Sequence, residues 1–254
     1  MSVKSLSSVR KACRILSALV DPAVVRLTDI ARVTGLDMTT CSRILSDLQK
    51  EGFVEREPQN KHYSFSNQAY LMHHAAFRRF CPVTAARPAL IRLAKEFMDT
   101  VILSVPQGWQ SICADLCFGD YPIRANYLSV GSHRPLGVGA GSLALLSAMP
   151  AHEIEAVLPF VQEGLKRYPD YSMELLRSKI IEGQQKGYSI LLDVVVNKMG
   201  GIAMSIMGPQ GTPLAAISIA ALNERITQRE EELVLALRKE VQQIEQNWAT
   251  ISES

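Results

Sequence analysis

Hydroxyl and guanidinium side chains gather at one point in the N-terminal third of the chain. They follow Asp37, whose carboxylate is expected to cap a helix that begins there. Apolar residues at i, i+3, i+4 and i+7 predict the buried stripe of this helix: Cys41, Ile44, Leu45 and Leu48. The exposed face of its first turns then carries Thr39, Thr40, Ser42 and Arg43. Small hydroxyls and an arginine at the exposed start of a helix suit contacts with base edges in a DNA major groove.

The segments around this helix predict a helix-turn-helix with a wing. A short helix precedes it, with Thr28 as the expected N-cap, an apolar face of Ile30, Ala31 and Val33, and Gly35 at its end. After it, 53–56 and 61–65 alternate in sidedness and are joined by the turn-forming residues 57–60. A hairpin directly after the second helix is a wing. The alternative is an ordinary helical hairpin whose polar faces are simply solvated.

A second candidate binding segment lies near the middle of the chain. Gly139, Ala140, Gly141 and Ser142 open another predicted helix, and free amides at a helix N-terminus can bind an anion. The glycines could equally serve close helix packing. The segment follows a loop that contains proline and does not follow a strand, so a dinucleotide-binding loop is not expected.

Other reactive side chains lack the spacing that catalysis or metal binding requires. Cys113 and Cys117 have no nearby histidine or second cysteine pair, which favours buried or strand-borne thiols. His73 and His74 are adjacent and face different sides of a helix. The chain has neither a Ser-His-Asp order that we can defend nor an H-E-x-x-H string. We therefore expect no enzyme activity, no metal and no cofactor.

Length and composition indicate a soluble protein of two domains. The 254 residues are 47% apolar and 20% charged, without an apolar run near the ~20 residues of a membrane span. The polar N-terminus does not predict a signal peptide, and five cysteines without paired spacing fit a reducing cytoplasm. Residues 1–81 hold 12 Lys and Arg against 7 Asp and Glu, and residues 82–254 hold 15 against 18. A net charge of +5 beside −3 suits a nucleic-acid-binding module joined to another domain.

The remaining pattern predicts an α+β domain behind a linker helix. A first helix is expected from a cap at Ser8, with an apolar stripe of Val9, Ala12, Cys13, Leu16, Leu19 and Val20. Further helices are expected at 67–80, 87–98, 141–149, 152–158, 172–186 and 228–248. The last of these is expected to bury a seam of Leu233, Leu237, Val241 and Ile244. Strands are expected at 101–105 and 109–116 around a turn at 106–108, at 121–130 before a loop at 131–135, and at 202–207 and 214–220 around a turn at 208–211. Such an antiparallel sheet with helices leaves a concavity for a small ligand.

Three segments together resemble the IclR family of bacterial transcriptional regulators. Residues 36–55, LDMTTCSRILSDLQKEGFVE, resemble its recognition-helix signature, and 130–146, VGSHRPLGVGAGSLALL, resemble its glycine-containing loop before a helix. Residues 186–188 followed by 202–220 resemble its closing strands. The resemblance implies a winged helix-turn-helix at 1–66, a linker helix at 67–82 and a GAF-like effector-binding domain at 83–254.

The resemblance implies that the protein is a homodimer or homotetramer and that it binds palindromic operator DNA. It implies no membrane partner. Thr39, Thr40, Ser42 and Arg43 would then face base edges or phosphates. On the wing, Arg56, Lys61 and His62 would approach the DNA backbone or minor groove. Asp47 would repel phosphate, so we expect it to point away from the DNA.

The resemblance also implies that the second domain binds a small organic effector, often a carboxylate or an aromatic acid. The residues expected at this site are Trp109, Tyr127, Gly139, Ala140, Gly141, Ser142, Asp193 and Gly201; Met204 is expected in the core. Relatives commonly carry a second acid where this chain has Val194, a small polar residue or cysteine at Gly201, proline at Ser205 and a basic residue at Ser142. These departures leave open a constitutive DNA-binding protein that has lost its ligand response.

Overall fold

The computed structural model describes residues 6–21, 23–77, 82–125 and 127–252. The chain divides into two compact units, Met1–Cys81 (unit 1) and Pro82–Ser254 (unit 2), and each has a hydrophobic core of its own. Within the described residues, no helix is both long and apolar enough to cross a membrane.

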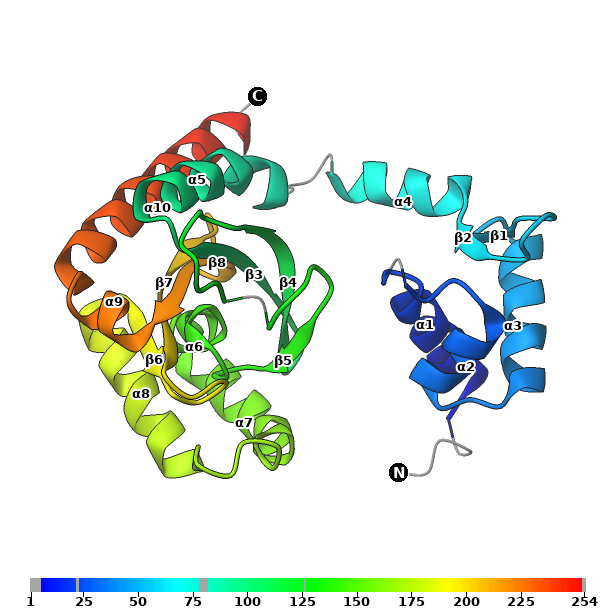
Figure 1. Ribbon diagram of the computed structural model, residues 1–254, viewed down its shortest axis with the longest axis horizontal. Helices are drawn as coiled ribbons and strands as arrows, with labels where there is room; N and C mark the ends of the chain where they lie inside the picture. The colour runs from blue at the N-terminus through cyan, green and yellow to red at the C-terminus, as the bar shows by residue number, and fades with distance from the viewer. Residues whose placement is uncertain (1–5, 22, 78–81, 126, 253–254) are drawn as a thin grey trace. The chain divides into compact units, whose positions relative to one another are not determined.

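Unit 1 is a winged helix-turn-helix followed by one more helix (Figure 1). Its elements are α1 (Ser8–Ala18), α2 (Leu27–Thr34), α3 (Met38–Lys50), β1 (Val54–Arg56), β2 (Tyr63–Phe65) and α4 (Asn67–Phe77). Gly35 ends α2 with φ 69°, a left-handed conformation that glycine adopts without steric cost. One core joins Ile15 of α1, Ile30 of α2 and Leu45 of α3 to the wing. The predicted helix-turn-helix and wing are confirmed.

Several local predictions in unit 1 are wrong. Ser7, and not Ser8, caps α1. Of the predicted stripe, Val9, Cys13 and Val20 are exposed, whereas Ala12, Leu16 and Leu19 pack in the core of unit 1. This segment is so rich in apolar residues that two overlapping helical stripes fit it, and packing against α2 and α3 selects the one with Ile15. Thr28 lies inside α2, which begins after Arg26 without a side-chain cap, and Val33 is exposed because only one side of this short helix meets the core.

Unit 2 is built on one antiparallel sheet of strand order β5-β4-β3-β8-β7-β6. Its strands are β3 (Thr100–Gln107), β4 (Gln110–Cys117), β5 (His133–Pro135), β6 (Ser189–Leu192), β7 (Met199–Met207) and β8 (Pro213–Leu222). Its helices are α5 (Pro82–Phe97), α6 (Ala140–Ser147), α7 (Ala151–Leu165), α8 (Met173–Lys186), α9 (Asn223–Thr227) and α10 (Glu230–Ser252). The predicted α+β class is confirmed.

The two faces of this sheet carry different helices (Figure 1). Helices α5 and α10 pack on one face, where Ile217 and Ile219 of β8 join Leu237 of α10 in one core. Helices α6, α7 and α8 pack with the opposite face, toward which Ala216 of β8 points. Successive strand residues alternate between the faces, so Ser218 lies on the side of Ala216. The predicted seam of the last helix is buried as expected.

The prediction erred where strand and loop signals are weakest. No strand forms in the described part of 121–130, and the only strand of that region is β5, inside the predicted loop. Pro106 lies in β3 opposite Ser111, so the turn falls at residues 108–109. Strand β6 and helix α9 were not predicted. Helix α5 begins at Pro82, which the prediction had placed in the linker; residues 78–81 of that linker lie outside the described residues.

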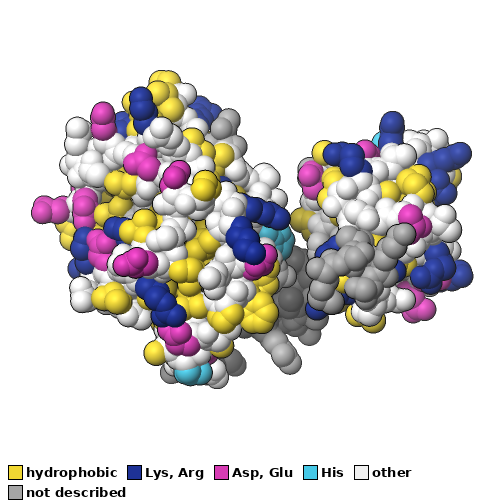
Figure 2. All heavy atoms as spheres, turned by 90° about the horizontal axis from the view of Figure 1, so that it is seen from below, with side chains coloured by type: hydrophobic (Ala, Val, Ile, Leu, Met, Phe, Trp, Pro, Cys, Tyr) yellow, Lys and Arg dark blue, Asp and Glu magenta, His cyan; other side chains and the backbone are white. Residues whose placement is uncertain are grey.

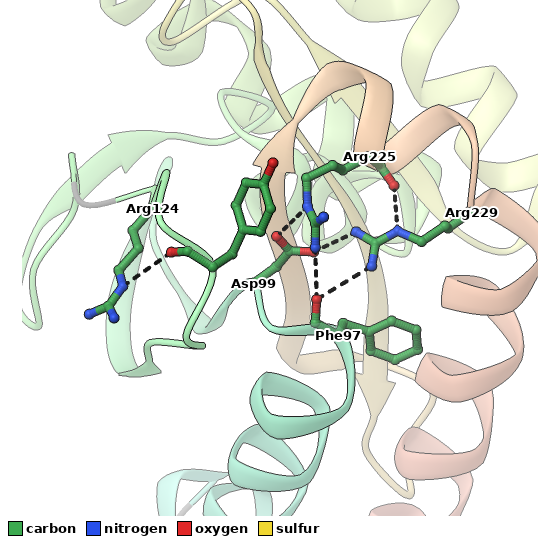
Figure 3. Close-up of polar contacts among 6 residues, drawn as sticks. Phe97, Asp99, Arg124, Arg225 and Arg229 are labelled. Atoms are coloured by element: carbon green, nitrogen blue, oxygen red, sulfur yellow. Dashed lines mark hydrogen bonds and ion pairs between the residues drawn. The ribbon is translucent and has the colours of Figure 1, made fainter.

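A buried carboxylate fastens the segment after β4 to the rest of unit 2 (Figure 3). Asp99, whose side chain is 1% exposed, accepts from Arg225 Nε at 2.9 Å and from Arg229 Nη2 at 2.5 Å. The Arg225 guanidinium lies 3.7 Å from the centre of the Tyr121 ring, and the Tyr121 amide donates to the carbonyl of Met98 at 2.8 Å. Segment 118–132 is therefore held at its start by helix α9 and by the junction of α5 with β3.

Candidate DNA-binding face and effector cavity

Helix α3 presents a continuous polar stripe to solvent. Its exposed members lie at i, i+3, i+4, i+7, i+8 and i+11: Thr39, Ser42, Arg43, Ser46, Asp47 and Lys50. Cys41, Ile44 and Leu45 hold the opposite side in the core, so burial fixes which residues face outward. Figure 2 shows Lys and Arg side chains at several separate places on the visible face of unit 1.

Asp37 caps α3 and involves Thr40 in the cap. The Asp37 carboxylate accepts from the Thr40 amide and from the Thr40 hydroxyl, both at 2.8 Å. These hydrogen bonds lower the pKa of Asp37 below its ordinary value. Thr40 is half-buried, whereas Thr39, Ser42 and Arg43 are exposed. Three of the four residues predicted to contact DNA are therefore on the exposed face of α3, and the fourth, Thr40, takes part in the helix cap.

Asp47, which we expect to point away from the DNA, shares the exposed stripe of α3 with two basic residues. Asp47 Oδ2 lies 3.7 Å from Arg43 Nη1, and Oδ1 lies 3.9 Å from Lys50 Nζ. The spacings i to i+4 and i to i+3 place all three side chains on the same side of the helix. The candidate face consequently carries an acid between two cations.

The wing residues differ in exposure. Arg56 and Lys61 are exposed, and the Arg56 guanidinium lies 5.2 Å from the centre of the Tyr63 ring. His62 is half-buried, and its Nε2 accepts from Arg26 Nε at 3.3 Å. Arg26 was not predicted at this face. No local pattern could have found it, because 36 residues separate it from His62.

Unit 2 contains a cavity between the sheet and the start of α6. It leaves room for the centre of a water molecule over about 50 Å³. Tyr127, Leu128 and Ser132 of segment 118–132 cover one side. The strands and the β6–β7 connection supply most of the rest: Ile102, Ser104, Ser111, Cys113, Leu191, Val194, Val195, Met199, Gly200, Gly201, Ser218 and Ala220.

Most of the residues predicted for an effector site line this cavity: Tyr127, Gly139, Ala140, Gly141, Ser142 and Gly201. Trp109 does not. It is half-buried against α7, close enough that a Cβ on Gly164 would lie 3.0 Å from its ring. Asp193 is exposed and closes a turn by accepting from the Lys198 amide at 2.7 Å, with φ 63°. Met204 is buried in the core, as expected.

The start of α6 combines free amides with close packing. Gly139 is the N-cap with φ 92°, and no side chain caps the first-turn amides. A Cβ at Gly141 would lie 2.9 Å from Ser104 Oγ and 3.2 Å from Ser218 Oγ, so this position requires glycine for packing. The start of α6 therefore has both the free amides that an anion site requires and the close packing that requires glycine. The Ser142 hydroxyl donates to the carbonyl of Pro135 at 3.0 Å.

Arg134 also lines the cavity, although its position in the sequence predicts only a loop. Its guanidinium lies 5.1 Å from the centre of the Tyr127 ring, and Nη2 donates to the Tyr127 carbonyl at 3.4 Å. Burial lowers its pKa below the ordinary arginine value. Within the part of the chain that the structure describes, Arg134 forms no ion pair. It lay in a predicted loop, where periodicity gives no signal of sidedness.

The cysteine pair is not arranged for chemistry. Cys113 and Cys117 both lie on β4, and burial raises the pKa of the Cys113 thiol to about 11, which keeps it protonated near neutral pH. Among the described residues, no cluster of three or more His, Cys, Asp or Glu side chains could hold a metal ion.

Known proteins resemble the chain over both units. The family model described as the IclR helix-turn-helix domain matches residues 8–58, and that of the bacterial transcriptional regulator IclR C-terminal domain matches residues 75–246. The HTH-type transcriptional regulator KipR of Bacillus subtilis is 25% identical over 224 residues, which cover 87% of this chain and 88% of that protein.

Solved structures show the same fold. An IclR transcriptional regulator from Alicyclobacillus acidocaldarius has a TM-score of 0.74 at 24% identity, with 95% of this chain and 98% of that chain covered. An IclR homolog from Microbacterium hydrocarbonoxydans, complexed with 4-hydroxybenzoate, has a TM-score of 0.71 at 18% identity, with 96% and 100% covered.

Proposed function

The chain belongs to the IclR family of bacterial transcriptional regulators, and on that premise we propose that a small organic effector controls its binding to operator DNA. The family consists of transcriptional regulators and not of enzymes. We assign DNA binding to 1–66, the linker to 67–82 and effector binding to 83–254. The cytoplasm, where the DNA is, is the proposed place of action.

The DNA-binding proposal rests on the polar stripe of α3. Thr39, Ser42 and Arg43 occupy the exposed start of this helix, where base edges are read in related motifs. We propose that Thr40 orders this start through the cap and that Arg56, Lys61 and His62 contact the backbone or minor groove. We propose a palindromic operator and a homodimer or homotetramer, because a two-fold symmetric protein reads half-sites related by the same symmetry.

The effector proposal rests on one observation: the guanidinium of Arg134, which has no ion pair within the described residues, lines a cavity beside the free amides of α6. Both groups favour an anion, and a carboxylate or aromatic acid supplies one. A homolog of the same fold is complexed with 4-hydroxybenzoate. The proposed effector contacts are Tyr127, Gly139, Ala140, Gly141, Ser142, Gly201 and Arg134; Trp109 and Asp193 lie elsewhere and are no longer proposed.

The competing function is a constitutive dimeric regulator whose second domain has lost its ligand response. The position of Asp193 favours this competing function. Asp193 is exposed, and its carboxylate closes a turn and does not line the cavity. A change of the thermal midpoint with ligand separates the two functions, since a ligand that binds only the folded state must raise it.

Binding to the intergenic DNA upstream of the gene tests the regulator proposal. We expect tight binding that resists random competitor DNA and weakens with salt, because specific sites add base contacts to a shared phosphate contribution. Equal affinity for intergenic and random DNA at every salt concentration, in several candidate promoters, would contradict it.

A further inference from the structure

A groove in unit 2 lies at the opposite end of α6 from the effector cavity. It forms where the ends of α6 and α8 meet β6 and β7 (Figure 1), and the exposed residues Gln184 and Gly187 lie at its rim. Among the described residues, none lines both the groove and the cavity. The first turn of α6 borders the cavity at Gly141, and its last residue, Ser147, borders the groove. The helical rise places these two residues roughly 9 Å apart along the axis, so the two sites are separate.

Three serine hydroxyls of this groove have no hydrogen-bond partner within the described residues: those of Ser147, Ser189 and Ser205. The Ser147 and Ser189 residues are only 7% and 3% exposed. Their hydroxyl oxygens border the same space beside Gly183, because a Cβ at that glycine would lie 2.8 Å from each of them. A buried hydroxyl without a partner is costly, since it has given up its hydrogen bonds to water. A ligand that donates and accepts hydrogen bonds here would restore them.

Strand register and one glycine bring these hydroxyls together. Ser189 pairs with Ala203 at the start of β6, and Ser205 follows Ala203 by two residues. Both serines therefore point to the face of the sheet that α6 and α8 cover. Because β6 begins at Ser189, Ser205 lies beyond the end of the β6–β7 ladder. The groove occupies the space beside β7 that β6 leaves uncovered, and Gly183 keeps a side chain of α8 out of it.

The charge of the lining favours a neutral ligand. Within the described part of the chain, no charged residue lines the groove. In the last turns of α8, Lys186 donates to Glu182 at 2.8 Å, so these two charges are already paired with each other. A charged ligand would lose hydration in the groove without gaining an opposite charge.

The mixture of polar and apolar groups favours a ligand with several hydroxyls. A serine hydroxyl both donates and accepts, and so does a hydroxyl of a ligand. Ala144, Ala148 and Met207 add apolar surface to the same groove. A sugar or a polyol matches both features, because its hydroxyl groups are separated by carbon–hydrogen surface. A hydrocarbon ligand would leave the serine hydroxyls without partners.

We propose that this groove binds a neutral polyhydroxylated molecule of the sugar and polyol class. Its hydroxyl groups pair with Ser147, Ser189 and Ser205, and its carbon–hydrogen surface packs against Ala148 and Met207. Each serine hydroxyl reaches the ligand by rotation about one bond, χ1, without movement of the backbone. The assignment goes beyond the proposed function, because it adds to unit 2 a second site with the opposite preference for charge.

Three compounds with the same six-membered ring test this selectivity. D-Glucose is neutral and hydroxylated, D-glucuronate carries a carboxylate in place of the hydroxymethyl group, and tetrahydropyran has no hydroxyl. Saturation-transfer NMR titrations of the full chain should show glucose binding at least about tenfold more tightly than either analogue. NMR is preferred to thermal unfolding because concentrated sugars stabilise proteins without binding to them. Stronger binding of either analogue would overturn the proposal, and so would absence of glucose binding, which would assign the hydroxyls to water alone.

Two serine variants test the hydroxyls without a cost in stability. Ser147→Ala and Ser205→Ala each remove a hydroxyl that has no partner within the described residues, so the unfolding midpoint without sugar should not fall. Each variant should weaken glucose binding at least about fivefold. Unchanged glucose affinity in both folded variants would overturn the assignment.

A filling variant and a matched control complete the series. Gly183→Ala places a methyl group in the space that the hydroxyls border and should abolish glucose binding. Ser178→Ala is the control on the same helix: this serine is exposed, and its hydroxyl donates to the carbonyl of Leu175 at 2.8 Å. Glucose affinity should be unchanged in Ser178→Ala. Equal losses in the two variants would contradict binding in the groove.

Arg134→Gln distinguishes the groove from the effector cavity. It removes the cation that lines the cavity and leaves the lining of the groove intact, so glucose affinity should be unchanged. Loss of glucose binding would place the sugar in the cavity and overturn the proposal. Operator binding, measured on the same preparations, keeps this proposal apart from the proposed function. Specific DNA binding without glucose binding would overturn the groove alone, and glucose binding without specific DNA binding would contradict the regulator alone.

Discussion

The face of α3 and the cavity of unit 2 are two candidate binding sites built in opposite ways. The α3 face comes from one helix of 13 residues, and its polar side chains are exposed. The cavity collects residues from Ile102 to Ala220 on all six strands of the sheet, one helix and three connections. A DNA surface must be accessible and periodic, whereas a ligand site must exclude water.

The two arginines at these sites show the consequence. The Arg43 side chain is 60% exposed and lies 3.7 Å from Asp47, so water screens its charge. Arg134 is half-buried, contacts Tyr127 and has no ion pair within the described residues. The first guanidinium can leave its partner for DNA at little cost. Among the described residues, the Arg134 guanidinium has no carboxylate beside it, so an anionic ligand would stabilise it.

The largest expected effect comes from the buried ion pair that fastens unit 2. Asp99→Ala leaves the guanidinium groups of Arg225 and Arg229 without their carboxylate and should lower the free energy of unfolding of unit 2 by about 3 kcal/mol. Urea unfolding followed by tryptophan fluorescence measures this selectively, because Trp109 and Trp248 both lie in unit 2.

Glu155→Ala is the matched control for this prediction. Glu155 and Arg177 also form a bidentate ion pair, with N–O distances of 2.7 and 2.9 Å, but both side chains are more than half exposed. Solvent screening should leave the unfolding curve almost unchanged. Equal destabilisation by the two variants would contradict the idea that burial, and not pairing geometry, makes Asp99 important.

Gly141→Leu tests whether the cavity and the α3 face act as separate sites. The new side chain must displace Ser104 or shift α6, which should cost unit 2 about 1–3 kcal/mol and abolish the ligand-dependent change in thermal midpoint. Operator affinity, measured by fluorescence anisotropy, should stay close to that of the parent protein. Loss of DNA binding in a folded Gly141→Leu protein would remove the separation between the sites.

Arg43→Ala sharpens the role of the α3 face. If Arg43 reads a base, its loss should weaken specific operator binding by about 1–3 kcal/mol and leave binding to random DNA less affected. Lys50→Ala, on the same stripe at the far end of the helix, serves as a comparison for a general charge effect. An equal loss on operator and random DNA would instead assign Arg43 to a phosphate.

The smallest effect should come from Asp47→Ala. Removing this acid takes away a repulsion from phosphate, so affinity for DNA of any sequence should rise, by no more than about 1 kcal/mol for so exposed a group. The difference between 50 and 200 mM salt in a filter-binding series measures the electrostatic part. Weaker binding to the operator would show that Asp47 contributes to reading the site.

The sequence alone determined the features that depend on neighbours along the chain. Local hydrogen bonding determines the Asp37 cap and the turn at Gly35. Helical periodicity determines the buried stripe of Cys41, Ile44 and Leu45 and the buried seam of α10. The family resemblance was equally readable, because its motifs are contiguous. For the same reason three of the four residues predicted on the α3 face were placed correctly on its exposed side.

Only the tertiary structure decided which distant residues share the cavity. Arg134 lies in a stretch predicted as loop, and it contacts Tyr127 through a guanidinium whose direction no local pattern specifies. By residue type, Trp109 and Asp193 were equally suitable for the cavity. In the structure, however, Trp109 packs against α7, and the Asp193 carboxylate accepts a hydrogen bond within a turn. A cavity is defined by residues far apart in sequence, and the cooperative packing of sheet and helices fixes their positions.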